Sequence, residues 1–144
     1  MAIRCLKLAG LYLLVGMTMG LVMGATEQFA LAPAHAHINL LGWVTPALAA
    51  VVFTLWLQTA TTWLAHAFFW IYNLALPPSM LALSLVLLGH SQWVPVVIAG
   101  QLAVYVAAIL FVVNILVGVR GPPAAAATTT ERRLPSERAA ADAR

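Results

Sequence analysis

The sequence predicts an all-α integral membrane protein, a bundle of four transmembrane helices followed by a polar tail. Of the 144 residues, 63% are hydrophobic and only 8% are charged, and the mean hydropathy is +0.96. A soluble domain carries about a quarter of its residues as charged side chains. The charge is also segregated, because Glu27 is the only formally charged residue between Leu8 and Val119. A chain that avoids charge over so long a stretch is adapted to lipid.

Turn residues divide the apolar stretch into four runs, each about 20 residues or longer and able to cross roughly 30 Å of hydrocarbon. The first run is longer than a signal-peptide core, so we expect it to stay in the mature protein. All four runs form one domain, residues 1–119, with helices expected at about 3–25, 33–57, 63–88 and 94–119.

Prolines and polar residues mark the ends and irregularities of these helices. Pro33 suits the first turn of the second helix, where a missing N–H is harmless. Pro77 and Pro78 lie inside the third helix and predict a kink or a local break. Residues 120–144 combine prolines, an Ala-Thr run and mixed charges without apolar periodicity, so we expect a disordered cytoplasmic tail.

The positions of the cationic residues predict how the chain is oriented in the membrane. Arg4 and Lys7 precede the first helix, and several arginines from Arg120 onward follow the fourth, so both termini should be cytoplasmic. We expect a multi-pass protein of a bacterial inner membrane, with loops 26–33 and 89–93 facing the periplasm. The basic ends explain the pI of about 9.6, which therefore indicates topology and not nucleic-acid binding.

A line of small residues runs along the first helix. Gly16, Gly20 and Gly24 are spaced by four, a pattern that lets a second backbone approach closely. Two interpretations remain open: helix packing inside one chain, or a surface for a homo-oligomer or a flat cofactor.

His35 and His37 are the most informative side chains, because ionisable residues inside a membrane helix are costly and mostly functional. Residues two apart on a helix point about 200° away from each other, so these two face one centre only where the helix is unwound. The His35 stripe continues through Asn39, Gly42 and Pro46, which are polar, small or kinking, and Asn39 and Gly42 on it are candidate cofactor-binding residues. The His37 stripe is bulky and apolar. We expect at least one histidine to be an axial haem ligand or a metal ligand; the alternative is that both sit at the membrane interface.

Other candidate ligands occur in the same outer region. His90, in the turn between the third and fourth helices, shares the predicted depth of His35; the alternative is an exposed loop histidine. Met23 is a candidate axial or copper ligand; the alternative is a methionine of the core. Glu27 could join an outward-facing metal site, and Tyr72 could line a cofactor pocket. His66 lies near the inner end of the third helix, roughly 20 Å away in depth at about 1.5 Å per residue, so it cannot share that site within one chain.

Four stretches, HAHINLLGWV, FFWIYNLALPPSM, LVLLGH and LFVVNIL, resemble the short four-helix members of the haem–copper oxidase (cytochrome c oxidase) subunit I-like proteins. The resemblance covers about residues 8–118. It implies haem b held by a histidine at the outer end of the second helix, a role that falls on His35 or His37. It also implies electron transfer or gas or redox sensing in a respiratory or nitric-oxide context, with a redox protein or a quinol as partner. Phe68 and Tyr72 stand where short relatives often carry histidines, so the second axial ligand would come from elsewhere.

These observations lead to three hypotheses about function. The first is a small membrane haem-b-binding protein, which would not reduce oxygen alone because it lacks the helices of the binuclear centre. The second is a copper or zinc site formed outward by His35, His37 and His90. The third is a structural accessory subunit of a larger respiratory complex.

Overall fold

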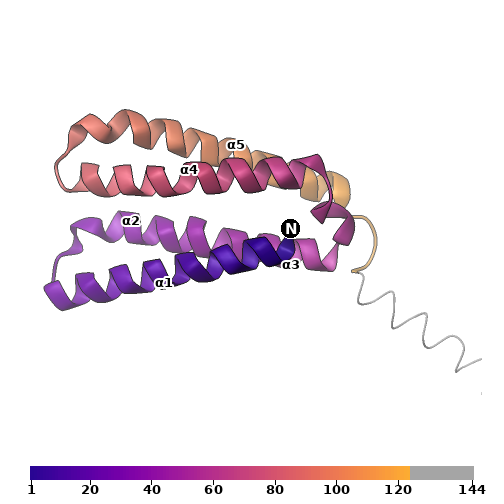
Figure 1. Ribbon diagram of the computed structural model, residues 1–144, viewed down its shortest axis with the longest axis horizontal. Helices are drawn as coiled ribbons and strands as arrows, with labels where there is room; N and C mark the ends of the chain where they lie inside the picture. The colour runs from indigo at the N-terminus through magenta and orange to yellow at the C-terminus, as the bar shows by residue number, and fades with distance from the viewer. Residues whose placement is uncertain (124–144) are drawn as a thin grey trace, which may run out of the picture.

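The computed structural model of the protein describes residues 1–123, which form helices joined by short turns (Figure 1). Most of the predicted disordered tail, residues 124–144, lies outside the described residues. Four helical segments are long and apolar enough to cross a membrane, which confirms the prediction of an all-α bundle with four transmembrane helices. They extend over Ala2–Thr26, Phe29–Leu55, Trp63–Leu87 and Ser91–Gly118.

The first, third and fourth spans are each built on one regular α-helix. These are α1 (Ala2–Thr26), α4 (Trp63–Leu87) and α5 (Val94–Gly118), the last preceded by the short 3-10 helix η4 (Ser91–Trp93). The second span is composite. Its parts are η1 (Phe29–Leu31), α2 (Ala32–His37), η2 (Ile38–Val44) and α3 (Thr45–Leu55), followed by the turn η3 (Leu57–Ala60).

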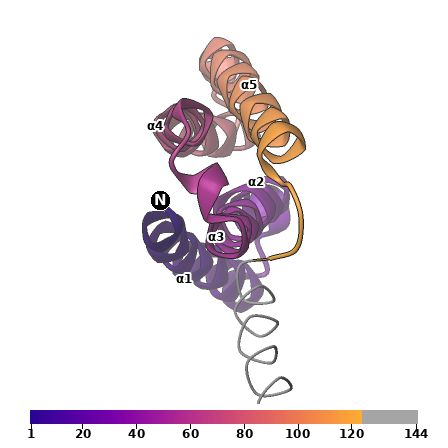
Figure 2. The ribbon, with the colours of Figure 1, turned by 90° about the vertical axis from the view of Figure 1, so that its right-hand side faces the viewer.

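The spans form two antiparallel hairpins that lie side by side (Figures 1 and 2). One hairpin contains α1 and the second span, and the other contains α4 and α5. An aromatic cluster joins the two: the ring of Phe111 stacks on Phe68 at 4.7 Å and meets Phe53 edge-on at 5.8 Å. Since Phe53 belongs to α3, this cluster anchors the second span to α4 and α5.

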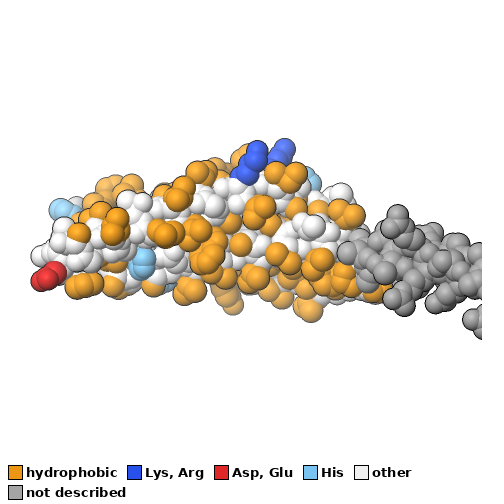
Figure 3. All heavy atoms as spheres, turned by 90° about the horizontal axis from the view of Figure 1, so that it is seen from below, with side chains coloured by type: hydrophobic (Ala, Val, Ile, Leu, Met, Phe, Trp, Pro, Cys, Tyr) orange, Lys and Arg blue, Asp and Glu red, His pale blue; other side chains and the backbone are white. Residues whose placement is uncertain are grey.

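Apolar side chains are spread over the face shown in Figure 3, and all four spans carry exposed large hydrophobic residues, as expected for a chain in contact with lipid. Leu21, Leu74 and Leu116 are among the most exposed, with 74%, 68% and 76% of their surface accessible. The α1–α2 turn carries Glu27 and lies at the same end as the α4–α5 turn, opposite the N terminus (Figure 1).

The helix α4 continues through Pro77 and Pro78 without a break. The expected local break in this helix is therefore wrong. Each proline removes one backbone hydrogen bond, but its fixed φ is compatible with helical backbone. Because α5 packs against α4, the helix keeps its winding despite those two missing bonds.

The second span contains the irregularity instead, a seven-residue π-helix over Ile38–Val44. Buried positions through this segment recur every four residues, at Ala34, Ile38, Gly42 and Pro46. In an α-helix, positions four apart drift by about 40° per step, since each residue turns about 100°. The wider i→i+5 winding of a π-helix takes more residues per turn, which offsets the drift of the flanking α-helical turns and keeps these positions on one buried face.

Polar contacts tie the turn η3 to the ends of α4 and α5. The Asn114 side chain is 1% exposed; it donates to the Thr59 carbonyl at 2.9 Å and accepts from the Thr62 hydroxyl at 2.8 Å. Thr62 is also the N-cap of α4, because its Oγ1 accepts from the Ala65 N–H at 3.1 Å. Gln58 donates to the carbonyl of Gly118 at 3.2 Å and so satisfies a backbone group at the end of α5.

Candidate functional site

His35 lies on α2 and faces the backbone of α1. Its imidazole is half-buried, and its Nδ1 is 3.0 Å from the carbonyl oxygen of Gly16. A Cβ built on Gly20 would lie 2.9 Å from Cε1 of the ring. The two glycines therefore form a surface without side chains on which the imidazole rests, and a larger residue at Gly20 would displace it.

Asn39 lies one turn after His35 and supports it. Its Nδ2 donates to the His35 carbonyl at 2.9 Å and lies 3.3 and 3.4 Å from the two ring nitrogens. A Cβ on Gly16 would come within 2.5 Å of the Asn39 Oδ1. The amide thus fills the space between the imidazole and α1, so His35, Asn39, Gly16 and Gly20 form one compact group.

The hydrogen bond to Gly16 determines the tautomer of His35. A carbonyl oxygen only accepts, so the bond requires a proton on Nδ1. In the neutral imidazole Nε2 then carries the lone pair, the form in which histidine binds a metal, and this atom lies 3.4 Å from the Asn39 Nδ2. Carbonyl acceptors of this kind commonly orient metal-bound histidines.

His37 has a different environment. Its side chain is exposed, and its Nδ1 donates to the carbonyl of Pro33 at 2.8 Å, within its own helix. On the predicted His37 stripe, Leu40 and Leu48 are exposed, with 61% and 57% of their surface accessible. The two histidines of α2 thus face different surroundings: His35 the interior of the hairpin, His37 the outer surface.

Gly42 and Tyr72, both predicted to be close to a cofactor, contact the chain itself. A Cβ on Gly42 would meet the Tyr12 ring at 2.7 Å, so Gly42 lets α1 approach the π-helix. Tyr72 is 1% exposed and its hydroxyl donates to the Leu41 carbonyl at 3.0 Å.

The remaining candidates are spread around the bundle. Met23 is buried at the end of α1, where its carbonyl accepts the Gln28 N–H at 3.2 Å. Glu27 is exposed in a left-handed conformation with φ 54°, and His90 is exposed in the turn before η4. His66 is exposed in the first turn of α4, with its Nδ1 bonded to the Thr62 carbonyl at 2.9 Å.

Within residues 1–123, no three histidine, cysteine or acidic side chains come together as a group that could hold a metal ion. A structural zinc site needs four such ligands and a catalytic one needs three. Haem iron needs only one or two axial side chains from the protein. A single histidine such as His35 could meet only the smaller of these requirements.

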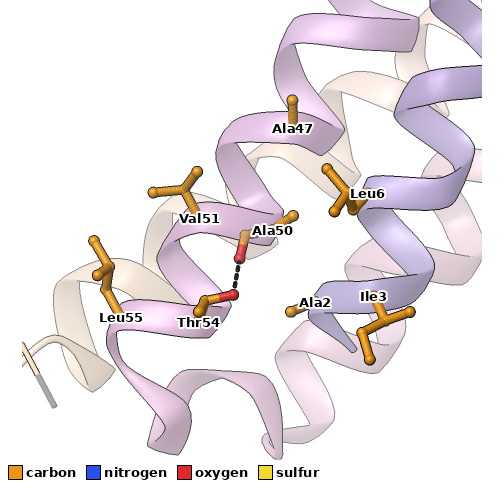
Figure 4. Close-up of a pocket in the computed structure, with 8 residues that line it drawn as sticks. All are labelled: Ala2, Ile3, Leu6, Ala47, Ala50, Val51, Thr54 and Leu55. Atoms are coloured by element: carbon orange, nitrogen blue, oxygen red, sulfur yellow. Dashed lines mark hydrogen bonds between the residues drawn. The ribbon is translucent and has the colours of Figure 1, made fainter. Parts of the chain in front are cut away.

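Three grooves elsewhere in the bundle are apolar and lack histidines. One, of about 250 Å³, lies between the start of α1 and α3; its only hydroxyl, on Thr54, donates to the Ala50 carbonyl at 2.8 Å (Figure 4). A second, of about 320 Å³, is lined by residues of α1, η2 and α4, and a third, of about 210 Å³, by residues of η2, α3, α4 and α5. The titratable side chains that line them are tyrosines, Tyr12 in the second groove and Tyr72 and Tyr105 in the third.

The glycine line on α1 is divided between two environments. Gly16 and Gly20 contact Asn39 and His35 of the same chain, which favours the interpretation as packing within one chain at these two positions. Gly24 has nothing within 4 Å of an added Cβ. Only the outer end of the line is therefore free for contact with a second molecule.

Sequence reasoning identified His35 and Asn39 but missed their partners. The acceptor for His35 is a backbone atom, the Gly16 carbonyl, which no side-chain pattern reveals. The π-helix was missed as well, because small and apolar positions four residues apart are also typical of a regular α-helix.

Comparison of the chain with protein-family descriptions, with curated proteins and with solved structures finds no match. Membership of the haem–copper oxidase subunit I-like family therefore stays a prediction that rests on the four quoted stretches.

Proposed function

We propose that this chain is a small membrane haem-b-binding protein of the haem–copper oxidase subunit I-like type, with His35 as an axial ligand. Its role would be electron transfer, or gas or redox sensing, in a respiratory or nitric-oxide context. The observation that carries the proposal is the hydrogen bond of His35 Nδ1 to the Gly16 carbonyl, which leaves the lone pair of the ring on Nε2, beside the Asn39 amide and inside a membrane span.

The residues around His35 fit an axial role. Bound haem b would supply one-electron redox chemistry, and the protein would supply orientation and electrostatics. The Gly16 carbonyl fixes the orientation of the ring. Asn39 holds the backbone of His35, and the absence of side chains at Gly16 and Gly20 keeps the ring close to α1.

A second copy of the chain would complete the site. His35 is only half-buried, and His37 on the same helix is exposed and bonded to the Pro33 carbonyl. Since Gly16 and Gly20 are occupied within the chain, we place the contact between copies at the outer end of α1, around Gly24 and the exposed Leu21. The second axial ligand would then come from the other copy or from Met23.

Absorption spectra of the detergent-purified protein test the proposal. After expression with added haem precursor, we expect a Soret band and reduced α and β bands of a b-type haem. His35→Ala should lose the bound haem, whereas the matched control His37→Ala, on the same helix but at an exposed position, should retain most of it. Spectra of the reduced protein with carbon monoxide or nitric oxide then separate a site open to gases from a closed electron-transfer site.

The outcomes distinguish the three hypotheses. A protein without a Soret band after haem supplementation refutes the proposal. Copper or zinc in elemental analysis, lost in both histidine variants, would favour the outward metal site instead. Retention of every bound cofactor in the double His35→Ala, His37→Ala variant would point to a structural accessory subunit.

A further inference from the structure

The π-helix η2 leaves one backbone carbonyl without a partner in its own helix. The Thr45 N–H donates to the Leu40 carbonyl, five residues earlier, and so is not available to Leu41. The next donor in the π pattern for Leu41 would be residue 46, which is Pro46 and has no N–H. The Leu41 carbonyl is therefore an orphan acceptor inside a membrane span, where water cannot satisfy it.

Tyr72 of α4 supplies the missing donor. Its hydroxyl is 3.0 Å from the Leu41 carbonyl oxygen, and its side chain is 1% exposed. Tyr72 is held in place by its own neighbours, since its ring lies 5.2 Å from that of Phe68 in the aromatic cluster. The bond therefore connects the irregular segment of one hairpin to the regular helix of the other.

The winding of η2 determines which residue of α2 faces α1. An i→i+5 turn takes one residue more than an i→i+4 turn. Relative to the residues that follow the turn, it therefore rotates the residues that precede it about the helix axis by on the order of 100°. Gly42 and Pro46 are fixed by contacts on the inner side of this segment, because Gly42 lies against Tyr12 and Pro46 is buried. With α-helical winding, a neighbour of His35 and not His35 itself would face Gly16 and Gly20.

We infer that Tyr72 is a positioning residue for His35: its hydroxyl caps the Leu41 carbonyl, stabilises the π-helix and thereby sets the imidazole on the α1 glycines. The relevance of this role to haem rests on the proposed function. The role itself, however, can be measured in the protein without haem.

A double-mutant cycle in the haem-free protein tests the link among Tyr72, Leu41 and Pro46. Tyr72→Phe removes only the donor, and we expect it to raise the unfolding equilibrium constant in detergent about tenfold. Pro46→Ala restores an N–H that makes the Tyr72 hydroxyl redundant, so in that background Tyr72→Phe should change the constant less than about twofold. Tyr105→Phe, at a residue that is 64% exposed on α5, is the matched control and should have no effect.

The ring nitrogens of His35 report its position directly. In ¹⁵N spectra of the haem-free protein, we expect the protonated Nδ1 of the wild type, and a shift of these signals in Tyr72→Phe but not in Tyr105→Phe. Equal effects of Tyr72→Phe in both backgrounds, or unchanged His35 signals, overturn the inference. If Tyr72→Phe alone does not fold, folding of the Pro46→Ala, Tyr72→Phe double variant supports it, and failure of both refutes it.

Spectra of the haem-loaded protein separate this inference from the proposed function. Tyr72→Phe should retain haem but shift the electron paramagnetic resonance signals of the ferric form, because the axial imidazole rotates. A protein that never binds haem refutes the proposed function while leaving the cycle and the ¹⁵N measurement valid as tests of Tyr72.

Discussion

At the scale of single residues, the site depends on the absence of side chains as much as on their presence. The His35 ring reaches a backbone carbonyl of α1 because Gly16 and Gly20 have no Cβ. Close approach of this kind is how helices associate in lipid, where apolar surfaces gain nothing from leaving the solvent. The same two glycines therefore serve both helix packing and the orientation of the imidazole.

Gly16→Ala tests this packing. The added Cβ would lie 2.5 Å from the Asn39 Oδ1, so the amide must move, and we expect a loss of about 1–3 kcal/mol in the free energy of unfolding. Thermal or denaturant unfolding in detergent measures it.

Gly24→Ala is the matched control on the same helix, since nothing lies within 4 Å of its added Cβ. It should leave the stability of the monomer unchanged or raise it slightly through helix propensity. If Gly24→Ala lost as much free energy of unfolding as Gly16→Ala, backbone freedom and not the contact with Asn39 would explain the destabilisation by Gly16→Ala. Weaker self-association of Gly24→Ala would support a contact between copies there.

At the scale of elements, buried polar bonds hold the irregular segments. The turn η3 is tied to α5 through Asn114 and begins α4 through Thr62. The π-helix is tied to α4 through Tyr72. In both places a side chain from a regular helix satisfies backbone groups that a turn or a bulge leaves free, as the hydrocarbon environment requires.

Thr62→Ala should destabilise the bundle, because Thr62 both caps α4 and donates to Asn114. An N-cap alone contributes about 1 kcal/mol, and the loss of the donor to a buried amide adds about 1–3 kcal/mol. Equilibrium unfolding of Thr62→Ala measures the sum. Thr62→Ser keeps both bonds and should restore most of the stability, while Thr61→Ala, at an exposed neighbour, should behave like the wild type.

At the scale of the whole molecule, the described residues form two hairpins joined by an aromatic cluster. Many exposed side chains are large and apolar, and the charged residues lie toward the ends of the spans. The turns that carry Glu27 and His90 lie at one end, opposite the N terminus. The orientation of this bundle in the membrane remains the prediction made from Arg4, Lys7 and the arginines after α5.

Cysteine labelling measures that orientation. In a Cys5→Ala background, single cysteines at Gln28 and Gln92 should react with a membrane-impermeant reagent from the periplasmic side of intact cells. A cysteine at Arg120 should react only after the membrane is opened. Labelling of Arg120→Cys alone in intact cells would show the inverted orientation, and labelling of all three would contradict a sealed four-span topology.

The sequence by itself determined the four spans, because runs of apolar residues of sufficient length have no other stable place than lipid. It also separated His35 from His37, since residues two apart on a helix point in different directions. Tertiary structure alone decided that α4 keeps its winding through two prolines while the second span forms a π-helix. The reason is that the partners of these polar groups, the Tyr72 hydroxyl for the Leu41 carbonyl and the Gly16 carbonyl for the His35 ring, come from other helices and are set by three-dimensional contact, not by spacing along the chain.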